Sequence, residues 1–215
     1  MILIIQVEHV SKKIGQNVVL NDISLKMESG KIYGLKGCNG SGKTMLMRCL
    51  CGLIYPTSGR IMIDDAQLGK DILIPPHVNA LIESPSFLYE YSGKKNLRLL
   101  ADLQGNITDE SIANQLQEVG LDAEDRRPFR KYSLGMKQRL GIAAALLGTP
   151  KFILLDEPMN AIDEVGKEQL RAAFFRRRDN GCLIVMSDHD SSELNLCSDV
   201  VLEMKAGKIE NSYQP

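Results

Sequence analysis

The sequence has no tryptophan, only 5% aromatic residues and no apolar run that approaches 18 residues. A run of about that length is needed to cross a bilayer as a helix, so no membrane span is predicted. The apolar stretch after Met1 ends at Gln6 without a basic flank or cleavage site, which argues against a signal peptide. The net charge is only −1, so no basic field draws the chain to nucleic acid or anionic lipid.

Disulfide or metal-binding patterns are also missing. The five cysteines are odd in number and have no C-x-x-C spacing. We interpret them as reduced thiols of a cytosolic protein. Cys38 lies in a glycine-rich loop, where the simpler interpretation, a small residue at a variable position, is favoured over a redox role.

Length and residue patterning predict one α/β domain over residues 1–215. Strand-like segments occur at 3–10, 18–27, 31–37, 60–64, 152–155, 182–187 and 200–203. Residues 84–149 are helical in pattern, and Thr108 is a predicted N-cap for a helix that ends at Gly120. We therefore expect a β-rich core at 1–83 and 150–215, with an antiparallel layer, interrupted by a helical insertion at 84–149.

A glycine-rich loop follows the strand-like segment KIYGLKG. Its residues match G-x-x-x-x-G-K-[ST] and are Gly37, Cys38, Asn39, Gly40, Ser41, Gly42, Lys43 and Thr44. Glycines let successive backbone N–H groups turn toward phosphates, and the N-terminus of the next helix adds partial positive charge. Lys43 is placed to reach the β- and γ-phosphates, and the Thr44 hydroxyl to ligate Mg²⁺. The loop predicts a nucleotide site.

Two adjacent acids end the apolar segment FILL. Asp156 is placed to hold Mg²⁺, and Glu157 to orient and polarise an attacking water. Considered alone, Asp-Glu-Pro after a strand is more often the start of a loop, but a phosphate loop upstream reverses that preference. His189 follows the strand-like CLIVMS and is placed to sense the γ-phosphate, although a lone histidine there is more often solvated.

A Ser-x-Gly turn that opens a helix precedes the acidic strand. Together these segments resemble the nucleotide-binding subunit of ATP-binding cassette transporters over essentially the whole chain. GCNGSGKT is similar to the Walker A loop, FILLDEP to the Walker B strand, and residues 160–163 to the D-loop. His189 is similar to the switch histidine, and YSLGM at 132–136 to the signature, usually Leu-Ser-Gly-Gly-Gln.

The resemblance implies a P-loop NTPase (RecA-like) core with an antiparallel β subdomain and an inserted α-helical subdomain that carries the signature. It also implies a head-to-tail dimer around two ATP molecules with Mg²⁺. Ser133 and Gly135 of one subunit would then face the phosphate loop of the other. Ser133 begins a predicted helix. The N–H groups and the positive dipole end of that helix can therefore bind a γ-phosphate supplied by the other subunit.

Three features, at four positions, depart from the family pattern. Ile14 stands where an aromatic residue usually lies under adenine, and apolar contact would replace stacking there. Glu83 stands in place of the Q-loop glutamine, and its carboxylate is placed to meet Mg²⁺ or the attacking water. Leu134 and Met136 replace Gly and Gln of the signature. Glu83 and the following Ser-Pro-Ser-Phe are similar to bacitracin- and lantibiotic-type export ATPases.

Three further clusters have more than one interpretation. A cluster of aromatic and apolar residues follows Glu83 and consists of Phe87, Leu88, Tyr89 and Tyr91. These residues either line a groove for a helix of a membrane partner or pack the helical insertion, and both roles can coexist. Arg176 to Arg178 end a predicted helix, where a solvated face that complements the helix dipole is favoured over a lipid or nucleic-acid contact. Arg126 and Arg127 are surface charges or partner contacts, and the sequence leaves both open.

The leading functional interpretation is an ATP-hydrolysing subunit of a membrane exporter, peripheral on the cytoplasmic face of the cell membrane. A separate transmembrane permease would supply the pathway, and a second cassette, identical or related, would complete the dimer. The cargo would be a peptide or an antimicrobial compound. The alternatives are a non-hydrolysing ATP-binding regulatory subunit and a soluble cassette ATPase without a transport role. No nucleic-acid partner is expected.

Overall fold

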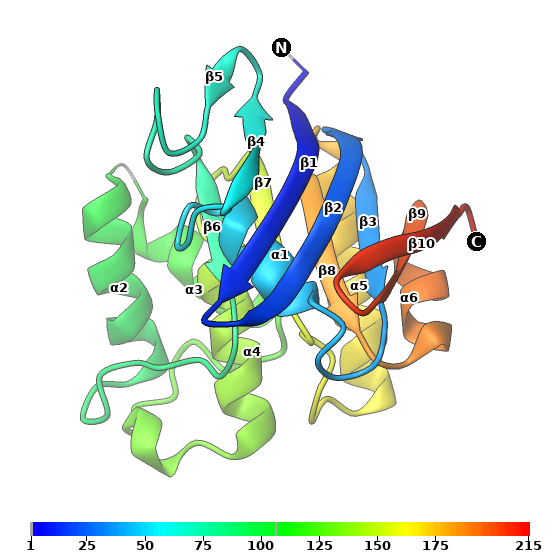
Figure 1. The fold of residues 1–215 in the computed structure, drawn as a ribbon. Coiled ribbons are helices and arrows are strands. Elements are labelled where there is room, and N and C mark those ends of the chain that lie inside the picture. Colours follow the sequence, from blue (N-terminus) through cyan, green and yellow to red (C-terminus); the bar gives the residue numbers. More distant parts are fainter. Residues whose placement is uncertain (1, 106) are drawn as a thin grey trace.

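The computed structural model describes residues 2–105 and 107–215, which form two sheets and the helices around them (Figure 1). The four-stranded antiparallel sheet has the order β2 (Asn17–Glu28), β1 (Ile4–Ile14), β4 (Ser58–Ile63) and β5 (Ala66–Gln67). The six-stranded sheet has the order β10 (Lys208–Tyr213), β9 (Val200–Lys205), β3 (Ile32–Lys36), β8 (Leu183–Asp188), β7 (Phe152–Asp156) and β6 (Val78–Leu81). In that sheet β10 runs antiparallel to β9, and the other neighbouring strands pair in parallel.

The central strands of the larger sheet are buried on both faces. Residues 152–155 of β7 and all of β8 are buried, which is why these strands have continuous apolar sequences. Their parallel register places Asp156 opposite Ser187 at the carboxyl end of the sheet. Ligand sites of open α/β sheets form at that edge.

Helix α1 (Lys43–Leu50) lies between the two sheets (Figure 1). Its buried residues Leu46, Met47 and Leu50 pack into one apolar cluster with β1, β4 and one face of the larger sheet. Because the first residue of α1 is Lys43, this packing fixes the position of the glycine-rich loop relative to both sheets.

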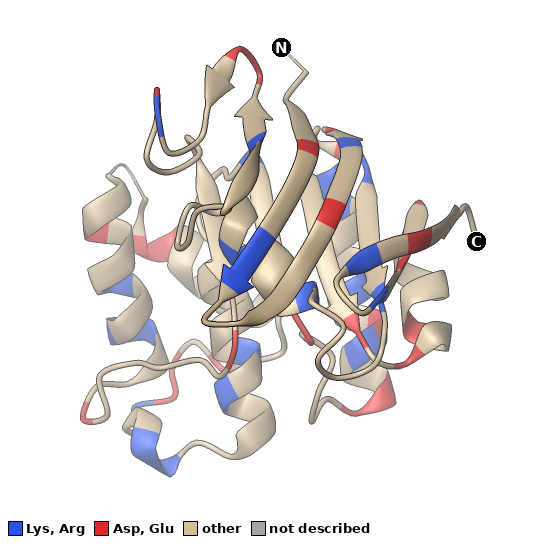
Figure 2. Cartoon of the chain, viewed as in Figure 1, with Lys and Arg blue, Asp and Glu red and all other residues tan. Residues whose placement is uncertain are grey.

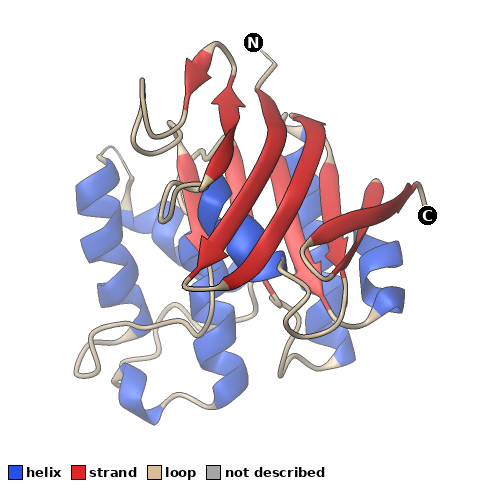
Figure 3. Ribbon diagram, viewed as in Figure 1, coloured by secondary structure: helices blue, strands red, loops and turns tan. Residues whose placement is uncertain are grey.

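The remaining helices lie on the opposite side of the larger sheet (Figure 3). They are α2 (Gly93–Gln104), α3 (Asp109–Glu118), α4 (Leu134–Ala145), α5 (Glu164–Asp179) and α6 (Ser191–Cys197), with a 3-10 turn at Phe129–Lys131. Of these helices, α4, α5 and α6 contact the strands of the sheet, and α2 and α3 pack on α4 and α5. Across residues 2–105 and 107–215, no helix combines the length and apolar character that a membrane span needs. Acidic and basic residues are interspersed over the ribbon (Figure 2).

Most predicted elements are confirmed, with different limits in places. Thr108 caps α3, since its hydroxyl accepts a hydrogen bond from the amide of Ser111 at 3.1 Å. The Ala-rich segment that starts at Gly141 lies in α4, which begins at Leu134. The sequence patterns did not predict β6, because this short edge strand has only one fully buried side chain, that of Leu81.

Candidate active site

The glycine-rich loop leaves β3 and enters α1 in a conformation suited to an anion. Gly40 and Gly42 have φ values of 80° and 108°, a left-handed region that side chains disfavour. Among the described residues, no side chain caps α1 at Gly42 and no acid lies in its first turn. The free N–H groups and the positive end of the helix dipole are therefore available to phosphate oxygens.

Lys43 folds back over this loop. Its ammonium group donates hydrogen bonds to the carbonyl oxygens of Gly37 at 2.7 Å and Cys38 at 3.3 Å. The Lys43 side chain is buried, whereas Cys38 and Asn39 are exposed. The Ser41 hydroxyl is buried and has no hydrogen-bond partner within the described part of the chain. The loop thus brings a cation and a free hydroxyl to the carboxyl end of β3.

Asp156 lies at the centre of a hydroxyl–carboxylate cluster. One of its oxygens accepts a hydrogen bond from the Thr44 hydroxyl at 2.7 Å, and the other from the Ser187 hydroxyl at 2.5 Å. Paired oxygen donors of this kind suit Mg²⁺, which takes one or two protein ligands and completes its shell with phosphate and water. No group of three His, Cys, Asp or Glu residues forms a fuller metal cage among residues 2–105 and 107–215.

Glu157 is fixed by its backbone at the end of β7. Its amide donates to the hydroxyl and the carbonyl oxygen of Ser187 at 3.0 and 3.1 Å, and its φ is 48°. The Glu157 carboxylate accepts a hydrogen bond from the side-chain amide of Asn160 at 2.6 Å. The side-chain amide of Gln138 donates a hydrogen bond to the backbone carbonyl oxygen of Glu157 at 3.1 Å. These contacts hold the carboxylate where the strand ends.

These groups surround a cavity of about 430 Å³. Its lining residues are Thr44, Glu83, Ser84, Leu134, Gln138, Asp156, Glu157, Asn160 and Ala161. The structure therefore brings together Thr44, Asp156, Glu157 and Glu83 of the residues predicted from the sequence. It adds Gln138, whose contacts link α4 to the acidic strand end.

The Ser-x-Gly segment begins α4 as the sequence predicts. Ser133 is the exposed N-cap, and its hydroxyl accepts a hydrogen bond from the Met136 amide at 3.2 Å. A Cβ atom on Gly135 would lie 2.8 Å from the carbonyl oxygen of Ala161, so a larger residue would separate the two segments. Ser133 and Gly135 do not line the cavity in the described structure, whereas their neighbour Leu134 does.

His189 and Ile14 are also absent from that cavity wall. His189 is exposed after β8, and its Nδ1 lies 3.5 Å from a carboxylate oxygen of Asp188. Burial raises the pKa of Asp188. Ile14 is the half-exposed last residue of β1, opposite Asn17 in a hairpin. The role of Ile14 in binding a base therefore stays a prediction, and so does the role of His189 in sensing a phosphate.

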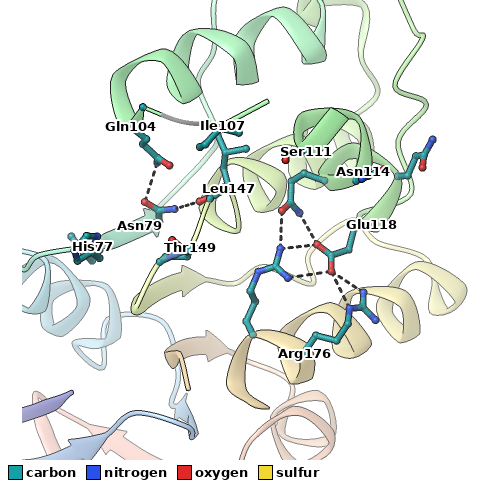
Figure 4. A pocket seen from close by; sticks show the side chains of 17 residues that line it. His77, Asn79, Gln104, Ile107, Ser111, Asn114, Glu118, Leu147, Thr149 and Arg176 are labelled. Atoms are coloured by element: carbon teal, nitrogen blue, oxygen red, sulfur yellow. Dashed lines mark hydrogen bonds and ion pairs between the residues drawn. The ribbon is translucent and has the colours of Figure 1, made fainter. Parts of the chain in front are cut away.

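A larger cavity of about 1120 Å³ lies at the opposite end of β6 and β7 (Figure 4). Its wall includes Asn79, whose side chain bonds the carbonyl oxygen of Leu147 at 3.0 Å. The Arg177 guanidinium bonds Glu118 and Gln115, both at 2.8 Å, and so ties α5 to α3. Most of these polar groups form hydrogen bonds with one another. We therefore interpret this wall as a structural contact between helices.

The same contacts correct the prediction of a solvated arginine run. Arg176 is exposed, but Arg177 is largely buried against Glu118, and Arg178 pairs with Asp179 and Asp199. Successive residues of a helix are rotated by about 100°, so three adjacent arginines point in different directions and meet different partners. Arg127, whose role the sequence left open, pairs with Asp125 at 2.8 Å.

Comparison with known proteins places these features in a family. The model of the family described as ABC transporter matches residues 20–160. The uncharacterized ABC transporter ATP-binding protein YybJ of Bacillus subtilis (strain 168) is 42% identical over 208 residues, which cover 97% of this chain and 95% of that protein. The chain belongs to the ABC transporter family. The resemblance on which the sequence interpretation depends is thereby confirmed.

Further ABC transporter proteins extend the comparison. The bacitracin transport ATP-binding protein BcrA of Enterococcus faecalis is 38% identical over 208 residues, which cover 96% of this chain and 68% of that protein. A dimeric post-hydrolysis state of the ATP-binding cassette MJ0796, bound to ADP and Pi, superposes with a TM-score of 0.86 over 98% of each chain. Its sequence identity is 22%, so this likeness concerns the fold, and it confirms the expected fold class.

Proposed function

We propose that this chain is the ATP-binding and hydrolysing subunit of an ABC exporter, acting with a separate transmembrane permease. The observation that carries the proposal is the convergence of Thr44, Asp156 and Glu157 on one cavity beside the uncapped N-terminus of α1. In this proposal, residues 84–149 form a helical subdomain inserted into one ATPase domain that spans 1–215. The subunit would lie at the cytoplasmic face of the membrane that holds the permease.

Each group has a distinct task in this mechanism. The loop amides and Lys43 bind and orient the phosphates of ATP. Thr44 and Asp156, with Glu83 beside them, would hold Mg²⁺, which neutralises phosphate charge when bound. Glu157 accepts a hydrogen bond from the attacking water and directs it at the γ-phosphorus.

The second half of each site would come from a partner cassette. Ser133 is exposed at the start of a twelve-residue helix, so α4 can offer its N–H groups to a γ-phosphate on another subunit. The described dimer of MJ0796, which shares this fold, supports such an assembly. The partner would be a second copy of this chain or a related cassette.

The experiment that tests the proposal is an ATPase assay of the purified wild-type chain with and without Mg²⁺. We expect hydrolysis to require Mg²⁺. We also expect it to be slow, because the chain without its permease would close as a dimer only transiently. ATP binding with no phosphate release, alone or with the permease, would instead favour a regulatory subunit.

The names of the relatives support export of an antimicrobial peptide as the task. BcrA is named for bacitracin transport, and its similarity to this protein covers 96% of this chain. We propose that a peptide or related antimicrobial compound is the cargo of this chain's transporter. Stimulation of the ATPase by candidate compounds, measured on the assembled membrane complex, tests that assignment.

We expect Leu88→Ala combined with Tyr89→Ala to reduce permease-stimulated ATPase activity severalfold without unfolding the chain. Leu88 and Tyr89 are 54% and 62% exposed, so they are available to a permease helix. Phe87 instead packs edge-on against Phe129, with 5.2 Å between ring centroids. The measurement compares stimulated with basal hydrolysis, and Leu103→Ala at another exposed site is the control. Unchanged stimulation would contradict the docking role.

A further inference from the structure

Helix α1 presents a cation to the acid that replaces the usual glutamine. Arg48 lies in the last turn of α1, four residues after Thr44, so both side chains project from one face of the helix. A guanidinium nitrogen of Arg48 forms an ion pair with a carboxylate oxygen of Glu83. One face of α1 therefore contacts Asp156 through Thr44 and Glu83 through Arg48.

Glu83 is held at the cavity in an unusual backbone conformation. Its φ is 66°, in the left-handed region that a residue with a Cβ atom adopts only when its surroundings require it. Glu83 lines the same cavity as Asp156 and Glu157, so three carboxylates face that space among the described residues. The Glu83 side chain is mostly exposed, whereas that of Arg48 is mostly covered.

This arrangement creates a charge problem for a triphosphate ligand. A third carboxylate near the phosphates repels them, and the repulsion acts over several ångströms at the moderate effective dielectric of a protein surface. A glutamine at position 83 would not have this effect because it carries no charge. The paired guanidinium cancels the added charge, and it also fixes the direction of the carboxylate.

We propose that Arg48 is a positioning residue of the ATP site, which neutralises Glu83 and holds its carboxylate at the cavity wall. The inference rests on the proposed function, since it takes this cavity as the site of Mg²⁺ and ATP. It explains how a chain with Glu83 in place of glutamine keeps its affinity for the anionic ligand. It also predicts that Arg48 matters only when Glu83 is a carboxylate.

The test is a double-mutant cycle on the full chain. Binding of Mg²⁺ with a non-hydrolysable ATP analogue is measured by calorimetry for wild type, Arg48→Gln, Glu83→Gln and the double variant. We expect Arg48→Gln to weaken binding by about fivefold in the Glu83 chain and by less than about twofold in the Glu83→Gln chain. Arg48→Lys keeps the charge and should restore most of the affinity. Added salt should shrink the fivefold effect, because an exposed charge is screened.

A matched control and two contrary outcomes make the test decisive. Arg60→Gln breaks a comparable ion pair with Glu8 on the antiparallel sheet, 2.6 Å long, and should leave binding unchanged. Equal losses from Arg48→Gln in both backgrounds would overturn the inference and assign Arg48 a structural role. No loss in either background would also overturn the inference. Failure of the wild-type chain to bind the Mg²⁺ analogue would instead count against the proposed function.

Discussion

Replacing Glu157 with glutamine is expected to abolish ATP hydrolysis while ATP binding persists. Glutamine has nearly the same shape, and the backbone contacts that fix position 157 involve its amide and carbonyl groups, which the change leaves in place. The lost property is the negative charge that polarises the attacking water, and a general base contributes about 10²- to 10⁴-fold to the rate. We expect kcat to fall by at least about 100-fold.

The same variant should accumulate as a dimer when ATP is present. Hydrolysis would normally open the dimer, so a chain that binds ATP without cleaving it remains closed. Size-exclusion chromatography with light scattering, with and without Mg²⁺ and ATP, measures this directly. Glu164→Gln is the control, because it removes an exposed carboxylate seven positions along the chain that, within the described structure, pairs with Lys167 in α5. Equal hydrolysis rates in wild type and Glu157→Gln would show that Glu157 is not the base.

Sequence patterns predicted the parts of the site that are local in the chain. The loop from Gly37 to Thr44, the acids at the end of β7 and the cap at Ser133 each depend on residues a few positions apart. Spacing rules therefore apply to them directly, since glycine conformations, strand burial and helix capping are short-range effects. The structure then brings Thr44 within hydrogen-bond distance of Asp156, 112 residues later.

Contacts that depend on tertiary placement could not be predicted in this way. Ser187 meets Asp156 because β8 and β7 are adjacent and in register, and no local pattern in the sequence specifies that register. The partner of Glu83 is Arg48, in a helix that is packed between two sheets. A run of like charges such as Arg176 to Arg178 suggests solvent exposure until the helix that bears it is placed against α3.

Replacing Ser133 with aspartate is expected to block ATP-dependent dimerisation while leaving the fold and the ATP affinity of the monomer intact. Aspartate is as good an N-cap as serine, so α4 should begin normally. The new carboxylate would face the γ-phosphate of the partner's ATP. Two like charges about 4 Å apart repel by about 1 to 4 kcal/mol between bulk water and a protein surface, and each dimer has two such sites. The ATPase rate should drop by at least about tenfold.

Ser92→Asp is the matched control for this substitution. Ser92 caps α2 in the same manner, with its hydroxyl accepting a hydrogen bond from the Lys95 amide at 3.3 Å, but it lies outside the signature segment. Its aspartate variant should dimerise and hydrolyse ATP normally. A comparable loss in both variants would mean that added charge at any helix start disturbs the chain.

Mixing two inactive variants tests whether Ser133 acts on the other subunit. A Ser133→Asp chain retains its phosphate loop, and a Lys43→Ala chain retains its signature segment. If each site combines the loop of one chain with the signature of the other, the mixed dimer contains one intact site, so ATPase activity should return when the two are combined. If Ser133 serves the ATP of its own chain, neither site of the mixed dimer is intact and the mixture stays inactive.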